Sequence, residues 1–405
     1  MVFEGDNMMG VKRTNRSAAI RILHEQGSIS RKHLAECIKL TPAAITKIVG
    51  ELIEENIISE GKTVPNGGAG RREVMVELNS RAKCALGVLI NLRVAMLSAV
   101  WLDGTVIFSE EVKLPDFADA DGTVEQLSAR LAELVKKTGL KKEQILGLGL
   151  AIRGITLNDQ RIVVDSYGAI NKKNYPIAAR FEETTGYKVV MANNVRALFS
   201  AQMFLAKDTS VNSQFFLRCE YGIGGALSVN GKIWYGGSER CSEIGHVPVI
   251  RRGGKPCHCG KSGCLETIAS PMAILDDARA ILSKEKTPVL WLMAEKNGGE
   301  ISLEDVLESA HNGDAGTSEI LDRAVNQLAT ALKNVIYVID PAKIVLYGKV
   351  FENSYYLMRL LSELSEGVDS GHNITIEKSR YNQQLEEKAA GLLMVEYYFE
   401  QGGML

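Results

Sequence analysis

The sequence predicts a small helical domain that ends in a β-hairpin, followed by a larger α/β region built in two halves. Three observations predict this fold class. The first eighty residues show three short helical periodicities and then two strand patterns. After residue 84, strand and helix patterns follow the order βββαβα, which recurs with insertions. The length of 405 residues suits about two to four folded units.

The composition is that of a soluble globular protein. Apolar residues make up 45% of the chain and charged residues 24%, with a net charge of −2, which excludes disordered and membrane classes. The first residues do not resemble a signal peptide, and no stretch approaches the ~18 apolar residues of a spanning helix. We therefore expect a cytoplasmic protein, whose seven cysteines serve as metal ligands or buried thiols rather than disulfides.

The first domain begins with three helices. Apolar spacing predicts a first helix that stops at Gly27 and a second whose cap lies within residues 28–30. Thr41 then has the place of an N-cap, and Pro42 that of the first residue of a third helix. The residues of this helix that are spaced to face inward are Ile45, Ile48, Val49, Leu52 and Ile53.

The third helix also presents a face suited to DNA. Its exposed start is small, hydroxylic and basic, so it can enter a major groove closely. A Gly-rich loop over residues 61–72 joins two strand patterns and ends in arginines that suit a minor groove. Residues 11–50 contain eight basic and two acidic residues, a net charge of +6 that fits a phosphate-facing surface.

We therefore predict a winged helix-turn-helix over residues 1–80, with double-stranded operator DNA as its partner. The residues expected at the DNA are Arg31, Thr41, Ala43, Ala44, Thr46, Lys47, Arg71 and Arg72. The alternative is a protein-interaction or dimerisation module, which three short helices and a hairpin would also fit.

A cluster of cysteines predicts a metal site in the second half. Cys257, Cys259 and Cys264 fall within eight positions, and Zn²⁺ prefers thiolate and imidazole ligands in a tetrahedron. His246 and His258 are the candidates for the fourth ligand. We favour His246, because His258 would require a sharp fold between two ligating cysteines. Four protein ligands leave no open position, so the zinc would be structural. The alternative is three free thiols in a loop.

This segment resembles the ROK family of sugar kinases and repressors. The resemblance is carried by Gly245-His246 and Cys257-x-Cys259-Gly260-x-x-Gly263-Cys264-x-Glu266. Gly27-x-Ile29-Ser30-Arg31 and Gly70-Arg71-Arg72 also resemble the N-terminal domain of the ROK repressors. The resemblance implies that the histidine and the three cysteines bind zinc, and that Glu243, His246 and Glu266 contact sugar hydroxyls.

The same resemblance implies an actin-like, ribonuclease-H-like fold of two duplicated lobes with the ligand between them. The domains we expect are the winged helix-turn-helix over 1–80, lobe one over 84–198 completed by a C-terminal helix over 383–405, and lobe two with the zinc site over 199–382.

The phosphoryl-transfer residues of the ROK kinases are missing. Kinases of this family have an Asp-x-Gly-Gly-Thr turn, but residues 86–94 contain neither the glycine pair nor the carboxylate. Asn194 stands at the place of the catalytic aspartate, and an amide cannot act as a general base near neutral pH. Tyr347 and Lys349 occupy places where the kinases usually have glycines. We therefore expect no enzymatic activity.

We expect a sugar-responsive repressor of carbohydrate genes, with a sugar or sugar phosphate as effector and a homodimer, or alternatively a homotetramer, as the assembly. The expected sugar-binding residues are Gly154, Asn193, Asn194, Glu243, His246 and Glu266. Taken alone, Asn193 is equally typical of a helix cap. The alternatives are an ATP-dependent ROK sugar kinase and a scaffold that binds no ligand.

Overall fold

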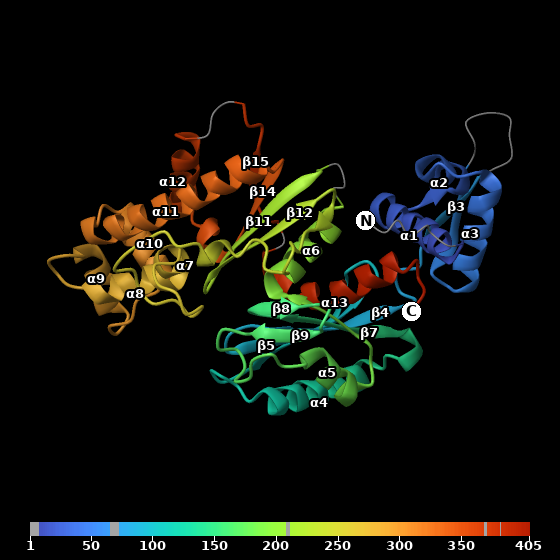
Figure 1. Cartoon of the computed structure of the whole chain (residues 1–405), viewed down its shortest axis with the longest axis horizontal. Helices are drawn as coiled ribbons and strands as arrows, with labels where there is room; N and C mark the ends of the chain where they lie inside the picture. The colour runs from blue at the N-terminus through green and yellow to red at the C-terminus, as the bar shows by residue number, and fades with distance from the viewer. Residues whose placement is uncertain (1–7, 65–72, 208–210, 368–370, 381) are drawn as a thin grey trace. The chain divides into compact units, whose positions relative to one another are not determined.

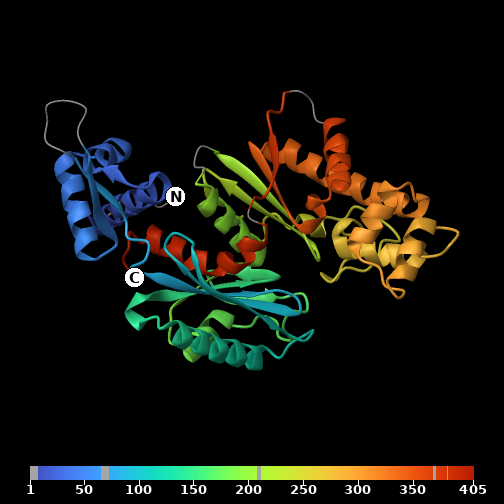
Figure 2. The same cartoon turned by 180° about the vertical axis from the view of Figure 1, so that it is seen from behind.

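The computed structural model describes residues 8–64, 73–207, 211–367, 371–380 and 382–405. The chain divides into two compact units, of which the first comprises Met1–Lys207 with Gln383–Leu405 and the second Asp208–Asn382. Figures 1 and 2 show their elements from opposite sides. Among the described residues, no helix is both long and apolar enough to cross a membrane.

The first unit begins with the predicted three helices and hairpin. The helices are α1 (Met8–Gln26), α2 (Arg31–Ile38) and α3 (Pro42–Glu54), and the antiparallel strands are β1 (Ile29–Ser30), β3 (Glu73–Leu78) and β2 (Ile58–Val64), in that order across the sheet. As predicted, Thr41 caps α3, since its Oγ1 accepts a hydrogen bond from the N–H of Ala44 at 3.3 Å. Strand β1, which pairs Ile29 with Val76, was not predicted.

The predicted inward face of α3 is partly confirmed. Ile45, Val49 and Leu52 are fully buried, whereas Ile48 and Ile53 are only half-buried. A helix on the surface of so small a domain covers a narrow stripe, so the residues at its margins keep contact with water. Three core positions are enough to fix the helix and leave its opposite side exposed.

The rest of the first unit is a five-stranded sheet covered on both faces. Its strands are β10 (Val189–Asn193), β7 (Ile145–Ile152), β4 (Cys84–Ile90), β5 (Val94–Trp101) and β6 (Val106–Lys113), in that order. Helices α4 (Ala120–Thr138) and α5 (Ile177–Thr185) lie on one face, and α6 (Asn194–Ala206) and α13 (Asn382–Glu400) on the other (Figures 1 and 2). Glycine at 149 lets α13 lie close to strand β7, because a Cβ there would lie 1.7 Å from the carbonyl oxygen of Ala390 on α13.

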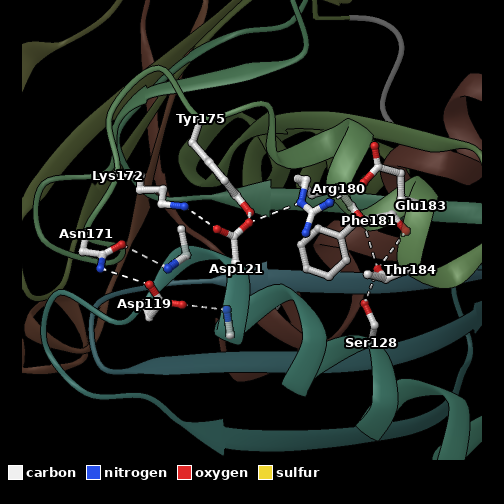
Figure 3. A network of polar contacts seen from close by, with 12 residues as sticks. Asp119, Asp121, Ser128, Asn171, Lys172, Tyr175, Arg180, Phe181, Glu183 and Thr184 are labelled. Carbon is white, nitrogen blue, oxygen red and sulfur yellow. Dashed lines mark hydrogen bonds and ion pairs between the residues drawn. The ribbon is translucent and has the colours of Figure 1, made fainter.

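A polar network ties the start of α4 to the loop that follows the small hairpin of β8 (Ile155–Leu157) and β9 (Ile162–Asp165). The Asp119 carboxylate caps α4 at the N–H of Gly122. Asp121 accepts hydrogen bonds from Lys172 and from the Tyr175 hydroxyl, as Figure 3 shows. These two bonds lower the pKa of Asp121 to about 2. The loop is therefore held on the α4 side of the sheet.

The second unit repeats the pattern of a sheet with helices. Its strands, in order, are β13 (Lys232–Ile233), β12 (Ile223–Val229), β11 (Ser213–Cys219), β14 (Lys343–Tyr347) and β15 (Thr375–Lys378). Its α-helices are α7 (Glu266–Ala269), α8 (Pro271–Ile281), α9 (Pro288–Lys296), α10 (Leu303–His311), α11 (Ala315–Ile339) and α12 (Ser354–Ser365). The long helix α11 contacts α7, α8, α10 and α12 and forms the spine of this unit's core.

Candidate metal centre, ligand site and DNA-binding face

The candidate metal centre brings four side chains to one point. His246 ends the short 3-10 helix η2 (Ile244–His246), and the three cysteines come from the loop before α7. The ligand atoms of His246, Cys257, Cys259 and Cys264 all lie within 4.8 Å of one another. His258, the alternative ligand, is exposed and is not part of this cluster.

The backbone of the loop explains how ligands so close in sequence converge. The N–H of Cys257 donates to the carbonyl of Lys261 at 2.8 Å, which closes a tight turn around Cys259. Gly263 has a φ of +74°, and a Cβ there would lie 2.2 Å from the carbonyl oxygen of Ile250. This position therefore accepts only glycine, which lets Cys264 turn back toward the cluster.

The distances within the cluster fit a tetrahedral zinc ion. The sulfur atoms of Cys259 and Cys264 are 3.6 Å apart, and the Cys257 sulfur lies 3.5 Å from Nδ1 of His246. Zinc bonds of ~2.3 Å to sulfur and ~2.0 Å to nitrogen imply tetrahedral edges of about 3.8 and 3.5 Å. Burial raises the pKa of Cys257 to about 12, so a thiolate at this place needs a cation beside it. The donor set can hold a metal ion.

Two of the expected sugar contacts lie beside this cluster. Because Nδ1 of His246 faces Cys257, its Nε2 is directed to the other side, 4.0 Å from a carboxylate oxygen of Glu243. The carboxylate of Glu266 accepts a hydrogen bond from the N–H of Ile223 at 3.0 Å. A Cβ on Gly222 would lie 2.1 Å from that carboxylate, so glycine at 222 leaves room for Glu266. The second unit thus holds these side chains by local contacts.

The other three expected sugar contacts lie in the first unit. Asn193 is the N-cap of α6, and its Oδ1 accepts from the N–H of Val195 at 2.8 Å. Its Nδ2 donates to the carbonyl of Gly154 at 2.5 Å, so these two residues are joined. Asn193 therefore has the structural role that its pattern also predicted. Asn194 is 2% exposed and belongs to a buried amide pair.

The partner of Asn194 was missed by the sequence analysis. Its Nδ2 donates to Oδ1 of Asn91 at 2.7 Å, and Asn91 is 6% exposed. The pattern of residues 86–94 predicts an apolar strand and the absence of the kinase turn, but not this pairing. The available signal was an amide side chain directly after an entirely apolar strand, β4. Asn91 fixes the orientation of the Asn194 amide at the start of α6.

The six expected sugar contacts are divided between the two units. Gly154, Asn193 and Asn194 belong to the first, and Glu243, His246 and Glu266 belong to the second. Each set is ordered within its own unit. A single ligand site made from both sets stays a prediction.

Sequence reasoning also missed a contact between Glu220 and the backbone of Lys349. The carboxylate of Glu220, directly after β11, accepts a hydrogen bond from the N–H of Lys349 at 2.8 Å. That N–H opens the 3-10 helix η3 (Lys349–Glu352), and backbone N–H groups of this kind are what anionic ligands use. The side chain of Tyr347 is buried and lies beside the Phe216 ring, with centroids 5.6 Å apart. The Glu220 carboxylate therefore occupies the N–H that an anionic ligand would use at this turn.

The structure describes six of the eight residues that the sequence predicts at the DNA. Thr41, Ala43, Thr46 and Lys47 are exposed, and Ala44 is half-buried. The Thr46 hydroxyl donates to the carbonyl of Pro42 at 2.8 Å, within its own helix. Arg31 pairs with Glu60 on β2 at 2.7 Å. Arg71 and Arg72 lie outside the described residues.

Part of the positive charge of residues 11–50 does not face outward, contrary to the prediction. Arg16, which contributed to the +6 of residues 11–50, is fully buried and pairs with Glu55 at 2.5 Å and with Glu51 at 3.3 Å. Lys12 also pairs with Glu51, at 2.8 Å. Glu51 lies on α3 and Glu55 is the C-cap of that helix, and both fall beyond the counted window. Part of the local positive charge therefore holds α1 against α3 and does not face outward.

Comparison with known proteins places the chain among regulators and kinases. It is 27% identical over 353 residues to the DNA-binding transcriptional dual regulator NagC of Escherichia coli (strain K12), covering 86% of this chain and 83% of NagC. It is 23% identical over 398 residues to the DNA-binding transcriptional repressor Mlc of the same strain, covering 98% and 96%. A glucokinase of Halalkalibacterium halodurans is 30% identical over 224 residues, which is 55% of this chain and 67% of the kinase.

A solved structure extends the likeness to the fold. The crystal structure of a ROK family transcriptional regulator, described as a homologue of the E. coli Mlc protein, matches with a TM-score of 0.79 and 23% identity. The match covers 97% of this chain and 98% of that one. This confirms the predicted fold class, a helical N-terminal domain followed by the two-lobe α/β fold. The sequence model of the ROK family matches residues 96–393, and the chain therefore belongs to the ROK family.

Proposed function

We propose that this protein is a sugar-responsive transcriptional repressor that binds operator DNA through α3 and the wing. The observation that carries the proposal is the α1–α3 domain, which lies in the same compact unit as a lobe whose catalytic aspartate is replaced by Asn194. NagC and Mlc, which it resembles over most of their lengths, are DNA-binding regulators by name. In this proposal the protein binds DNA and binds a sugar without phosphorylating it.

The effector in this proposal is a sugar or a sugar phosphate. In this proposal Glu243, His246 and Glu266 supply carboxylate and imidazole groups for polyol hydroxyls from one unit. Asn193 and Asn194, whose amides are bonded within the first unit in this structure, are the proposed contacts from the other. Relatives of this chain are named as N-acetylglucosamine and xylose repressors, which are monosaccharide regulators. Zn²⁺ bound by His246 and the three cysteines has a structural role, since all four of its positions are protein ligands.

The proposed mechanism depends on the two-fold symmetry of a homodimer. In a homodimer, two DNA-binding domains must meet half-sites about one helical turn, ~34 to 36 Å, apart. Sugar binding that changes the relation of the two lobes shifts this spacing and changes operator affinity. A fifty-fold switch requires the sugar to prefer one state by about 2.3 kcal/mol. A few hydrogen bonds to hydroxyls supply that difference.

Sugar phosphorylation is the second candidate, and the partial likeness to a glucokinase favours it. It requires a general base, which Asn194 cannot provide, and the turn of glycines and carboxylate that holds phosphate in the kinases, which residues 86–94 lack. We therefore propose that the protein is not an enzyme.

The ligand is tested by thermal shift with N-acetylglucosamine, xylose, glucose and the phosphates of each. A cognate sugar raises the unfolding midpoint because its binding adds RT ln(1 + [L]/Kd) to the free energy of unfolding. This is about 2.7 kcal/mol when the sugar concentration is one hundred times Kd. Glu266→Gln should abolish the shift, and Glu319→Gln, at an exposed position in α11, should leave it intact. A flat response to all six compounds would count against a monosaccharide effector.

DNA binding is tested on a duplex selected by the protein from a random pool. Lys47→Ala should weaken binding and reduce the slope of log affinity against log salt by about one. Lys296→Ala, at an exposed position in the second unit, is the matched control. Equal slopes for the two variants would remove Lys47 from the DNA contacts.

A further inference from the structure

Helix α6 connects the candidate ligand residues of the first unit with its DNA-binding domain. At its start are the cap Asn193 and the buried Asn194, which is bonded to Asn91. At its other end the ring of Phe204 stacks on the ring of His24 in α1, with centroids 4.0 Å apart. Asn194 and Phe204 are ten residues apart, which corresponds to ~15 Å along the helix. One straight element therefore touches both places.

The contact of α6 with α1 combines a hydrogen bond with stacked rings. Nε2 of His24 lies 3.1 Å from the carbonyl oxygen of Phe204, so it is Nε2–H that donates. The ring of Phe399, from α13, lies 5.8 Å from His24 and 5.9 Å from Phe204, which makes a cluster of three rings from three helices. Burial lowers the pKa of His24 to about 4, so this ring is neutral at physiological pH.

Helix α13 fixes α6 in place and reaches the same domain. The hydroxyl of Ser200, midway along α6, donates to the half-buried carboxylate of Glu396 on α13. Beyond α13, the guanidinium of Arg16 donates to the carbonyl of Gly402 at 2.7 Å. A Cβ on Gly403 would lie 2.4 Å from the side chain of Ile57, so the end of the chain fits closely into the DNA-binding domain.

Helix α6 has little freedom to absorb a displacement along its length. Ten of its 13 residues are buried, which includes polar side chains such as Arg196 and Gln202. Packed interiors transmit strain because they are as dense as organic crystals and contain few voids. A shift at one end is then carried to the other end rather than dissipated between them.

We propose that α6 is a coupling strut that transmits a change at Asn194 to α1 through Phe204 and His24. The inference rests on the proposed function, because it takes Asn194 as a ligand contact, and it names how that site is regulated. Tilting α1 moves α3, to which it is tied by the ion pairs of Lys12 and Arg16 with Glu51, and so alters the spacing of half-site contacts. His24 and Phe204 are positioning residues in this scheme, since neither touches ligand or DNA.

The test perturbs the ligand end by substitution, so it does not depend on which sugar binds. In the full-length protein, Asn91→Ala removes the acceptor of Asn194, and hydrogen exchange is measured on every helix. We expect amides in the first turn of α6 and in the second half of α1 to exchange about threefold faster or more, with α4 unchanged. In a His24→Ala background, Asn91→Ala should still act on α6 but should no longer change α1.

Asn171→Ala is the matched control, since Asn171 also supports a helix start, that of α4, by accepting from the N–H of Ala120. It should speed exchange in α4 and leave α1 unchanged. The strut is refuted if Asn91→Ala speeds α6 alone, or if its effect on α1 survives in the His24→Ala background. If Asn91→Ala speeds exchange in all helices, the milder Asn91→Ser is read by the same criteria. A sugar panel without any thermal shift would refute the sensor and leave this result standing.

Discussion

The metal centre and the joint of α1, α6 and α13 hold the chain together in opposite ways. The four candidate ligands fall between residues 246 and 264, in a segment with only short helices. The joint consists of His24, Phe204, Phe399 and the bond from Arg16 to Gly402, whose partners lie 180 and 386 residues apart. With the zinc ion that we propose, the first is a local clamp. The second depends on the whole of the first unit being folded.

This difference predicts where damage should spread. A fault in the clamp should disorder one segment of the second unit and whatever that segment positions. A fault in the joint should weaken both the DNA-binding domain and the sheet of lobe one, because each supports the other through α13. The following substitutions test this contrast.

The largest effect is expected from Cys257→Ser. It removes one of four ligands, and we expect bound zinc to fall to near zero and the second unit to lose about 3 kcal/mol of unfolding free energy. Elemental analysis and calorimetry measure the two quantities. Cys241→Ser changes a half-buried thiol outside the cluster and should retain the metal. Stoichiometric zinc in Cys257→Ser would exclude that residue from the ligand set.

Arg16→Met tests the joint. The methionine keeps much of the buried volume but removes the donors to Gly402 and to Glu55, for an expected loss of about 2 kcal/mol in the first unit. Denaturant unfolding followed by probes in both parts should show the DNA-binding domain and the lobe weakened together. The exposed Arg13→Met should change little. Loosening of the DNA-binding domain alone would show that the joint does not connect the two parts.

The same contrast explains what could be predicted from the sequence. The caps Thr41 and Asn193, most strands of the two large sheets and the cysteine cluster depend on residues within a few positions of one another, and spacing indicates them. The edge strand β15 was not predicted. The amide pair of Asn91 and Asn194 joins residues 103 apart, and only the fold reveals it. Arg16 was counted as part of a DNA-facing surface because its partners on α3 are distant in the sequence. Glu220 was missed for the same reason, since its partner Lys349 is 129 residues away.

Gly222→Ala asks whether local order in the second unit positions Glu266. The new Cβ would collide with the Glu266 carboxylate, so this side chain must move away from the N–H of Ile223. We expect sugar affinity to fall about tenfold, or 1.4 kcal/mol, by titration calorimetry, with zinc content unchanged. Gly237→Ala is the control, because a Cβ there meets open space. Unchanged affinity in Gly222→Ala would remove Glu266 from the sugar contacts.

Two titratable groups, the buried His24 in the joint and the half-buried Glu396 on α13 beside it, respond oppositely to pH. Burial raises the pKa of Glu396 from 4.5 to about 7, so its contribution to stability is complete below pH 4.5 and is lost as pH rises through 7. Burial lowers the pKa of His24 from 6.5 to about 4, so its contribution is complete above pH 6.5 and is lost as pH falls through 4. Between pH 4.5 and 6.5 the two trends oppose each other.

The charged groups that face these two side chains come from several elements. Lys207, Arg21 and Asp103 face His24, and Arg21 and Glu400 face Glu396. Arg21 therefore acts on both groups: its charge opposes protonation of His24 and favours ionisation of Glu396. Neighbouring charges modify each transition, but burial is the largest cause in both cases.

The smallest expected effect concerns the pH dependence of the stability of the first unit. This dependence should be nearly flat in the wild type and should slope in opposite directions in two variants. His24→Phe keeps a stacked ring but removes one titration, so the first unit should become more stable as pH falls from 6.5 to 4.5. Glu396→Gln should give the opposite slope, and neither can exceed about 1.4 kcal/mol per pH unit for one proton. Denaturant unfolding at several pH values measures both. If both variants kept the wild-type profile, neither group would change its charge on folding, and the joint would be held by packing alone.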